Sequence, residues 1–385
     1  MDVTFSIDDL LAQMGEWGAS DLHLTVGTPP AVRVHGELQA VDNLGSLTAD
    51  DTQQLLYRVL STEQQKRLEI ERQIDLSYAI PGVARFRVNV YFQRGALGAA
   101  FRQIPETIKS LEQLGLPGTL HELTAKPRGL VLVTGPTGSG KSTTLAAVID
   151  EINRTRPDHI LTIEDPIEFL HPHKRSIVNQ REIGGDTPSF ALALRAALRQ
   201  DPDVILVGEM RDLETIATAL TAAETGHLVF GTLHTQNAPS TIDRIVDVFP
   251  AEQQAQVRVQ LSATLQGVVT QALLPTVDRQ GRVAALEILF PDDAVRNLIR
   301  QAKVEQIYSV MQTSTARGMQ TMEQSLADLV MRGRITLEAA LASSSRPDML
   351  RGLLERAGYD FGPGEDDTGG GLRTVGGTGL RVAGA

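Results

Sequence analysis

The chain has 385 residues, enough for two or more domains, and 42% of them are hydrophobic, so it can bury a substantial core. It carries 36 basic and 47 acidic residues, a formal net charge of −11, and only 4% of its residues are aromatic. Proteins that bind nucleic acid over their whole surface are usually basic, so this balance argues against that class. The chain has no cysteine, which excludes disulfides and cysteine-ligated zinc and fits a reducing compartment.

No feature of the chain predicts a membrane span or a secretion signal. No apolar run reaches the ~18 residues that a membrane-spanning helix requires. The first five residues, Met1–Phe5, lack the basic and apolar regions of a signal peptide. We therefore expect a cytoplasmic protein.

Residues 1–104 are expected to form a mixed α/β domain. Apolar residues at helical spacing predict helices over Ile7–Trp17 and Asp50–Ile70. Runs of strand-forming residues predict strands at Leu22–Val26, Ala31–His35, Ile74–Ile80, Ala84–Gln93 and Gly98–Ile104. Between Ala84 and Val90 the residues alternate, which predicts one apolar face and one charged face.

The remaining chain divides into a linker, a larger α/β domain and a tail. Residues 105–128 contain three prolines and short polar stretches, as in a linker. From Gly129 strands alternate with helices, which indicates a parallel sheet in a domain over 129–356. Its candidate strands are Leu130–Thr134, Ile160–Glu164, Val204–Val207 and Leu228–Thr232. Residues 291–356 are expected to be helical, and the Gly-rich segment 357–385 to be disordered, because it has few apolar anchors.

A phosphate-binding loop follows the first strand of this second domain. The pattern Gly-x-x-x-x-Gly-Lys-Ser is matched in full by Gly135, Pro136, Thr137, Gly138, Ser139, Gly140, Lys141 and Ser142, with Thr143 next in the helix. Glycines let backbone N–H groups converge on phosphate oxygens, and the helix N-terminus adds a positive dipole. Lys141 can reach the β- and γ-phosphates of ATP, and the Ser142 hydroxyl can ligate Mg²⁺.

Acidic residues end two of the predicted strands. Glu209 follows Val204–Val207 and Gly208, where an acid would face the metal ion and the γ-phosphate. Glu164 and Asp165 follow the preceding strand, and either could orient or deprotonate water. A turn or helix-cap acid before Pro166 is an equal alternative for Asp165, so Glu164 is the stronger catalytic candidate.

Histidines and arginines supply further candidates. His227 and His234 flank a predicted strand and could sense the γ-phosphate, although structural histidines at strand ends are the alternative. Arg85, Arg87 and Arg102 carry the planar guanidinium that recognises phosphate. The sequence alone favours an exposed strand face for these arginines.

These motifs together resemble the secretion ATPase superfamily, over about residues 20–348. Four segments carry the resemblance: the phosphate loop, the acidic box Ile163–Glu168, Gly208–Asp212 and the histidine box Gly226–Thr235. Ser20–Leu24, Ala294–Arg300 and Gly318–Met322 are similar to the pilus retraction ATPases of twitching motility. The superfamily's assembly ATPases usually carry a four-cysteine metal site, which this chain cannot form.

The resemblance implies a homohexameric ring in which each subunit has an N-terminal PAS-like domain and a RecA-like ATPase domain. ATP and Mg²⁺ would bind between the two domains, with Lys141 and Ser142 in the loop roles. Glu209 would be the metal-side acid and Glu164 the water-activating acid, and these two roles could be exchanged. Arg87 and Arg102, with Arg85 as an alternative, would reach the γ-phosphate, and the histidine-box positions are occupied by His227 and His234.

The expected function is a motor for pilus disassembly at the cytoplasmic face of the inner membrane, docked on an inner-membrane platform protein and without nucleic acid. Ala294–Arg300 would couple hydrolysis to retraction. Its residues form two apolar rows, Ala294–Leu298–Ala302 and Val295–Ile299. A nucleic-acid translocase on a RecA-like core and a non-hydrolysing accessory subunit of the pilus machine are the alternatives.

Overall fold

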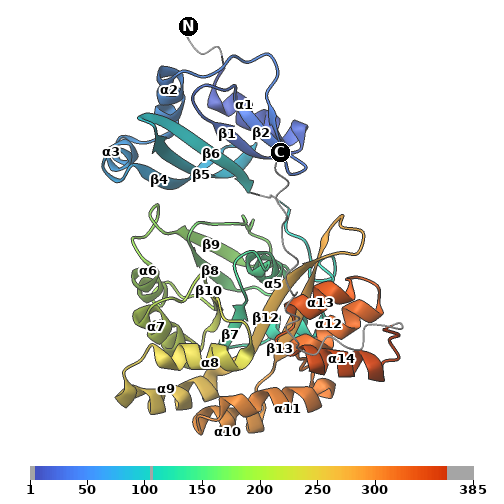
Figure 1. Ribbon diagram of the computed structural model, residues 1–385. Coiled ribbons are helices and arrows are strands. Elements are labelled where there is room, and N and C mark those ends of the chain that lie inside the picture. The colour runs from blue at the N-terminus through green and yellow to red at the C-terminus, as the bar shows by residue number, and fades with distance from the viewer. Residues whose placement is uncertain (1–4, 105–106, 362–385) are drawn as a thin grey trace, which may run out of the picture.

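Figure 1 shows the computed structural model, which describes residues 5–104 and 107–361. A smaller α/β domain with a six-stranded sheet lies above a larger domain with a seven-stranded sheet. Most of the predicted tail, residues 362–385, lies outside the described residues. Tyr359 and Phe361 pack against the C-terminal helices, so the packed chain continues past residue 356.

The N-terminal sheet is antiparallel and has the strand order β3-β2-β1-β6-β5-β4. Its strands are β1 (Ala19–Leu24), β2 (Ala31–Val34), β3 (Glu37–Ala40), β4 (Gln73–Ile80), β5 (Ala84–Gln93) and β6 (Ala96–Ile104). The alternation predicted for β5 is confirmed. Phe86, Val88 and Val90 are buried in the core, while Arg87 is exposed on the other face.

Three helices pack with this sheet: α1 (Ile7–Trp17), α2 (Ala49–Val59) and α3 (Thr62–Glu71). The single helix expected over Asp50–Ile70 is in fact two helices. The chain is extended at Leu60 and Ser61, and the Ser61 hydroxyl accepts a hydrogen bond from the Gln64 backbone as the N-cap of α3. Ser61, a residue typical of helix N-caps, is the sequence signal for this break. The apolar periodicity continues across the break and by itself predicts one helix.

The segment expected to be a linker is partly folded onto the larger domain. It contains a 3₁₀ turn at Gly118–Leu120 and the short helix α4 (His121–Thr124). Four leucines at positions 111, 116, 120 and 123 are buried in the core shared with β7 (Gly129–Thr134). Only the part nearer residue 107 remains without this packing.

The larger sheet has the order β13-β12-β7-β11-β10-β8-β9. Its neighbouring strands from β12 to β9 are parallel, while β13 is antiparallel to β12. The four predicted strands correspond to β7, β8 (His159–Glu164), β10 (Val204–Val207) and β11 (Leu228–Leu233). The sequence analysis did not identify β9 (Ile177–Glu182), β12 (Leu265–Pro275) or β13 (Arg282–Leu289).

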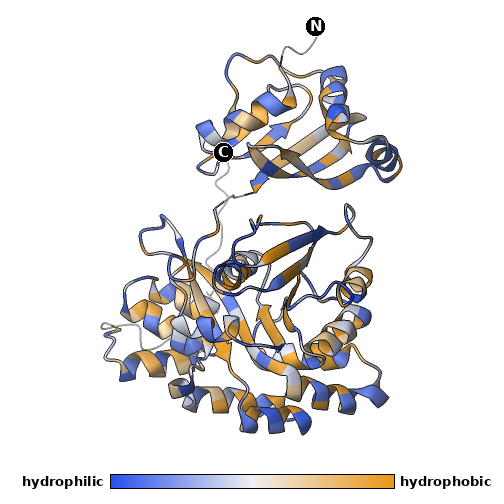
Figure 2. Ribbon diagram, turned by 180° about the vertical axis from the view of Figure 1, so that it is seen from behind, coloured by the Kyte–Doolittle hydropathy of each residue, from blue (hydrophilic) through white to orange (hydrophobic). Residues whose placement is uncertain are grey.

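Helices cover both faces of this sheet, which explains its continuously apolar strands. Successive residues of β7 alternate between two cores. Leu130 and Leu132 pack toward α6–α9, and Val131 and Val133 pack toward α5 and the folded linker. The helices are α5 (Lys141–Thr155), α6 (Phe190–Ala197), α7 (Leu213–Glu224), α8 (Ala238–Asp247) and α9 (Ala251–Thr264). Figure 2 shows the apolar strands inside this helical cover.

The helical C-terminal part is confirmed. It consists of α10 (Asp293–Arg300), α11 (Ile307–Thr313), α12 (Met322–Met331), α13 (Leu337–Ser343) and α14 (Pro347–Arg356). Helix α12 packs on β13, α13 on β12, α14 on α12 and α10 on α9. No helix in the part of the chain that the structure describes is long and apolar enough to cross a membrane.

Candidate active site

The phosphate-binding loop connects the end of β7 to the N-terminus of α5, and its glycines are required by its geometry. Gly135 has a φ of 136°, and a Cβ there would lie 2.3 Å from the Gln271 carbonyl oxygen on β12. Gly140 precedes α5 with a φ of 89°, and a Cβ there would lie 2.7 Å from Nε2 of the same glutamine. Backbone strain and close approach therefore exclude side chains at both positions.

A pocket of about 450 Å³ opens beside this loop at the carboxyl ends of the parallel strands. Five of the predicted functional side chains line it together: Lys141, Ser142, Glu164, Glu209 and His234. Thr137, Gly138, Gly140 and Thr143 line it as well. Gly135, Pro136 and Ser139 belong to the loop but are not among the residues that line the pocket.

Lys141 is held by the loop itself. Its Nζ donates to the carbonyl oxygens of Gly135 at 2.8 Å and Pro136 at 3.1 Å. Burial lowers the pKa of Lys141, while the carboxylates of Glu209 and Glu168 oppose that shift. The ammonium group is thus confined to the loop at the mouth of the pocket, where a phosphate chain would meet it.

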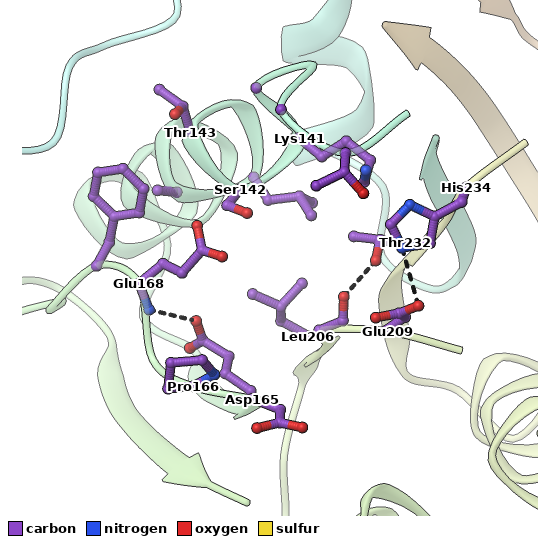
Figure 3. Close-up of a pocket in the computed structure, with 18 of the residues that line it drawn as sticks. Lys141, Ser142, Thr143, Asp165, Pro166, Glu168, Leu206, Glu209, Thr232 and His234 are labelled. Atoms are coloured by element: carbon purple, nitrogen blue, oxygen red, sulfur yellow. Dashed lines mark hydrogen bonds and ion pairs between the residues drawn. The ribbon is translucent and has the colours of Figure 1, made fainter. Parts of the chain in front are cut away.

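Glu209 lies two residues after β10, beside Arg211 and His234. Its carboxylate pairs with Arg211 and accepts from His234 Nε2 at 3.0 Å (Figure 3). Burial alone would raise the pKa of Glu209, but the hydrogen bond and charge of Arg211, together with His234, lower it. Glu209 is therefore a carboxylate at neutral pH, as a ligand for a divalent cation must be.

Glu164 lies at the end of β8 in a different environment. Its Oε1 accepts from Thr162 Oγ1 at 2.6 Å and Gln180 Nε2 at 3.2 Å, and its Oε2 accepts from the Glu168 backbone at 3.4 Å. Burial raises the pKa of Glu164. A more basic carboxylate held by three donors is suited to accept a proton from water.

The structure does not bring His227 to this pocket. His227 lies before β11, at the opposite edge of the sheet, where its Nδ1 contacts the Ala222 carbonyl oxygen at 2.9 Å. Within one subunit, His227 is thus a structural histidine at a strand end, the alternative that the sequence left open. Asp165 does line the pocket, on the exposed turn that follows Glu164.

The three arginines lie on the N-terminal sheet, outside the residues that line the pocket. Arg87 and Arg102 are paired across β5 and β6 on the exposed face, and Arg102 binds Asp21 at 2.7 Å. Arg85 instead pairs with Glu182 of β9 at 2.9 Å. Arg85, the alternative to Arg87 and Arg102, therefore forms an ion pair with a carboxylate of the larger domain.

Several residues of the site escaped the sequence analysis. Gln271 of β12 contacts the loop glycines, and its Oε1 accepts from Thr144 of α5 at 2.8 Å. Thr162 and Gln180 orient Glu164. Phe169, His171, Phe190, Leu273 and Arg282 line the pocket. Thr162 precedes Glu164 by two residues on a predicted strand, so strand alternation could have indicated it. Gln180 and Gln271 lie on strands that the sequence did not reveal, and only the strand order brings them to the site.

The residues present fit a nucleotide with its magnesium ion. The loop amides and Lys141 converge where a triphosphate would lie, and the Ser139 hydroxyl is buried without a hydrogen-bond partner among the described residues. Ser142 and Glu209 both line the pocket and offer it one hydroxyl and one carboxylate. Oxygen ligands of this kind, completed by phosphate and water, are those that Mg²⁺ prefers.

Comparisons with known proteins agree with this chemistry. A family model described as "Type II/IV secretion system protein" matches residues 100–342. The chain is 53% identical to the type IV pilus retraction ATPase PilT of Pseudomonas aeruginosa, over 90% of this chain and 99% of that protein. It is 41% identical to the type IV pilus ATPase PilU of the same organism, over 90% of this chain and 91% of that one.

A solved structure of the pilus retraction motor PilT with bound ADP matches with a TM-score of 0.85 and 55% identity. The match covers 90% of this chain and 99% of that one. The ATPase DotB of Legionella pneumophila matches with a TM-score of 0.72 and 32% identity, over 89% and 96% of the two chains. The chain therefore belongs to the type II/IV secretion system protein family, as an ATPase of its pilus retraction branch.

Proposed function

We propose that this protein is the hexameric ATP-hydrolysing motor that retracts type IV pili in twitching motility. One observation carries the proposal: Lys141, Glu164 and Glu209 converge on one pocket in a chain that is 53% identical to a pilus retraction ATPase over nearly its whole length. The identity to PilU is lower, at 41%, which favours the main retraction motor over an accessory ATPase.

The side chains of the pocket divide the hydrolytic work. Lys141 neutralises charge that grows on the β- and γ-phosphate oxygens during transfer. Glu164 accepts the proton of the attacking water, and Glu209, anchored by His234, reports the state of the γ-phosphate to β11. Ser142 and Glu209 would hold Mg²⁺, which would supply positive charge to offset that of the phosphates.

The N-terminal domain, proposed to span residues 1–104, completes the site from outside. Arg87 and Arg102 lie side by side on the exposed face of the sheet, where Arg102 also pairs with Asp21, and neither lines the pocket. With ATP bound between the two domains, the guanidinium groups of both arginines would reach and stabilise the γ-phosphate. The ring would act at the cytoplasmic face of the inner membrane on a platform protein.

The hydrolytic part of the proposal is tested with Lys141→Ala. We expect this variant to lose ~10²-fold or more of its turnover, because the point charge on the β–γ bridge is gone. ATPase assays on purified hexamers, with nucleotide binding measured separately, give the result, and twitching of a strain carrying the variant gives the cellular one. Turnover at the wild-type rate would remove the basis of the proposal.

The alternatives have distinct outcomes in the same assays. A nucleic-acid translocase would show ATPase activity stimulated by nucleic acid, and a non-hydrolysing accessory subunit would bind ATP without turnover. The net charge of −11 argues against a nucleic-acid translocase. The convergence of Lys141, Glu164 and Glu209 on one pocket argues against a subunit that does not hydrolyse ATP.

A further inference from the structure

Glu182, at the end of β9, is the point where the N-terminal domain touches the strand beside the catalytic pocket. A single carboxylate oxygen, Oε2, accepts three hydrogen bonds: from Ser77 Oγ at 2.7 Å, from Arg85 Nη2 at 2.9 Å and from the Ile167 backbone at 3.1 Å. Ser77 and Arg85 belong to β4 and β5 of the N-terminal domain. We call Ser77, Arg85 and Glu182 the interdomain latch.

The latch lies next to the proposed catalytic acid. Strands β8 and β9 are parallel, and Glu164 and Glu182 are Cα partners in their register. Directly opposed residues of neighbouring strands project to the same face, so the two carboxyl groups are neighbours. Gln180, two residues before Glu182, donates to Glu164. Strand β9 thus supports the catalytic acid through Gln180 and binds the N-terminal domain through Glu182.

The third hydrogen bond reaches the turn that closes over Glu164. Ile167 is buried, and its N–H donates to Glu182. The next residue, Glu168, donates its own N–H to Glu164. A change in the position of Glu182 is therefore transmitted through one peptide unit to a hydrogen bond on the catalytic carboxylate.

The charged side chains of the latch are largely shielded from water. The Glu182 side chain is 10% exposed and that of Arg85 is 22% exposed, whereas Arg102, in its pair with Asp21, is 72% exposed. Ion pairs removed from water lose little strength to screening, and the loss of one partner leaves a buried uncompensated charge. Loss of the Arg85 charge while the domains stay docked would leave Glu182 as such a charge beside Glu164.

We propose that Glu182 is a positioning residue for Glu164, and that the interdomain latch makes the geometry of the 165–168 turn depend on docking of the N-terminal domain. When Arg85 and Ser77 are engaged, Glu182 holds Ile167, and the turn holds Glu164 ready to accept a proton. When they withdraw, Glu182 loses two of its three hydrogen bonds, and its hold on Ile167 and the 165–168 turn loosens. The proposal rests on the role of Glu164 proposed above.

The test compares three variants of the full-length hexamer: Arg85→Gln, Glu182→Gln and the double variant. Arg67→Gln is the matched control, because it removes an exposed arginine–glutamate pair, Arg67–Glu71, on α3 of the same domain. Thermal unfolding identifies any variant that fails to fold. Ser77→Ala, which removes only a hydroxyl, provides a milder lesion of the latch for that case.

We expect both single variants to lower kcat by ~10-fold with KM within about twofold, because a small displacement of a reacting group affects the transition state more than substrate binding. The double variant is expected to lose no more than either single variant, since both break the same contact. Additive losses, or a kcat unchanged in both single variants, would contradict the latch.

The pH dependence of kcat separates positioning from simple stabilisation. The charged groups around the two carboxyls are Arg85 from β5, Asp186, which accepts from the Glu182 backbone, and Glu168 from the turn. Arg85→Gln leaves Glu182 uncompensated, so the acid limb should move to higher pH by about half a unit or more. Glu182→Gln removes the negative charge and should not move the limb upward. Identical pH profiles in the wild type and in Arg85→Gln would show that the charge of Glu182 does not act on Glu164.

Amide hydrogen exchange in the 165–171 segment tests the latch independently of ATPase activity. Exchange at the Ile167 and Glu168 amides should rise in Arg85→Gln and stay at the wild-type level in Arg67→Gln. Glu164→Gln is assayed in parallel: if it turns over normally, the proposed role of Glu164 fails, while the exchange result still decides the latch. Unchanged exchange in Arg85→Gln would refute it.

Discussion

At the scale of single residues, two carboxylates of the pocket have opposite proton affinities. Glu209 is surrounded by Arg211 and His234, which lower its pKa, whereas burial raises the pKa of Glu164. Environments that separate the pKa values of neighbouring acids usually mark different roles. This difference favours Glu209 as the permanent anion and Glu164 as the group that takes a proton, although the sequence left the two roles exchangeable.

Glu164→Gln and Glu209→Gln keep the shape of each side chain and remove its charge. We expect both variants to bind ATP and to lose ~10²-fold or more in kcat, because the lost interactions act mainly in the transition state. Equilibrium binding and single-turnover rates measured separately check this. Normal turnover in Glu164→Gln would make Glu164 a turn residue.

The same residue sets a pH dependence. A base must be ionised, so kcat should fall as the pH drops through the raised pKa of Glu164, above the ordinary value of 4.5. Glu209, whose pKa is lowered, should add no limb in that range. A kcat profile of the wild-type protein, limited to the pH range where it stays folded, tests this. An acid limb at or below the ordinary value would contradict the assignment.

At the scale of elements, strand β13 carries a buried acid that links α8 to the C-terminal helices. Glu287 Oε1 accepts from the Ala238 backbone at the start of α8. Nearby, the Glu323 carboxylate of α12 accepts from Tyr308 at 2.9 Å and Ser344 at 3.1 Å. Burial raises the pKa of Glu287 to about 7, with a further contribution from the Glu323 charge.

This shift makes stability depend on pH in a defined window. The folded pKa lies above the ordinary 4.5, so the folded state holds a proton that the unfolded state releases, and stability falls as pH rises from about 4.5 to 7. We expect Glu287→Gln to flatten this part of the profile, by up to ~3 kcal/mol across the window. Urea unfolding of both proteins at pH 5 and pH 8 measures it. Parallel profiles would show that Glu287 is not the group responsible.

Helix α10 corrects an expectation about its apolar rows. Val295 and Ile299 are fully buried, whereas Ala294 is exposed and Leu298 only half-buried. Arg296 binds the Ser262 carbonyl oxygen and Arg300 approaches its hydroxyl, so the basic face docks on α9. Polar replacement of Ile299 would damage the core, and only the exposed row can test coupling to retraction.

Ile299→Asn should therefore destabilise the fold by ~2–5 kcal/mol through lost burial and an unpaired amide. Ala294→Arg should change stability by no more than ~0.5 kcal/mol and leave the ATPase rate intact. If α10 couples hydrolysis to movement, as the family resemblance implies, Ala294→Arg stops twitching nonetheless. Thermal unfolding, ATPase assays and a twitching assay on both variants decide this, and normal twitching in Ala294→Arg would argue against coupling through this face.

At the scale of the whole molecule, the ATPase domain binds the segment that precedes its first strand. Leucines 111, 116, 120 and 123 are buried against β7 and α5, so a fragment beginning at Gly129 would expose them. The natural beginning of an isolated ATPase domain is therefore near residue 107. The N-terminal domain then contributes the latch and the exposed pair Arg87 and Arg102.

A fragment spanning residues 107–361 should fold and bind ATP but hydrolyse it at least ~10²-fold more slowly than the full chain, because external cations and the latch are missing. A fragment beginning at residue 129 should be less stable or insoluble. Calorimetric binding and ATPase assays on both fragments check this. Full activity of the 107–361 fragment would make Arg87 and Arg102 surface charges.

What the sequence determined is local and contiguous. Eight consecutive residues define the phosphate loop, and short apolar runs ending in Glu164 and Glu209 located both acids, because the carboxyl ends of parallel strands meet at one edge of a sheet. The exact bounds of α1 and β5 also followed from periodicity alone. Family motifs then supplied the function.

What only the tertiary structure decided depends on the order of strands that are distant along the chain. Gln271 meets the loop because β12 lies beside β7, and Gln180 meets Glu164 because β9 lies beside β8. The partner of Arg85 is 97 residues away, on a strand whose polar sequence concealed it. His227 and His234 flank one strand, yet a strand has two ends, and only one end reaches the pocket. Local patterns carry no information about which strands pair, so these contacts could not be read from the sequence.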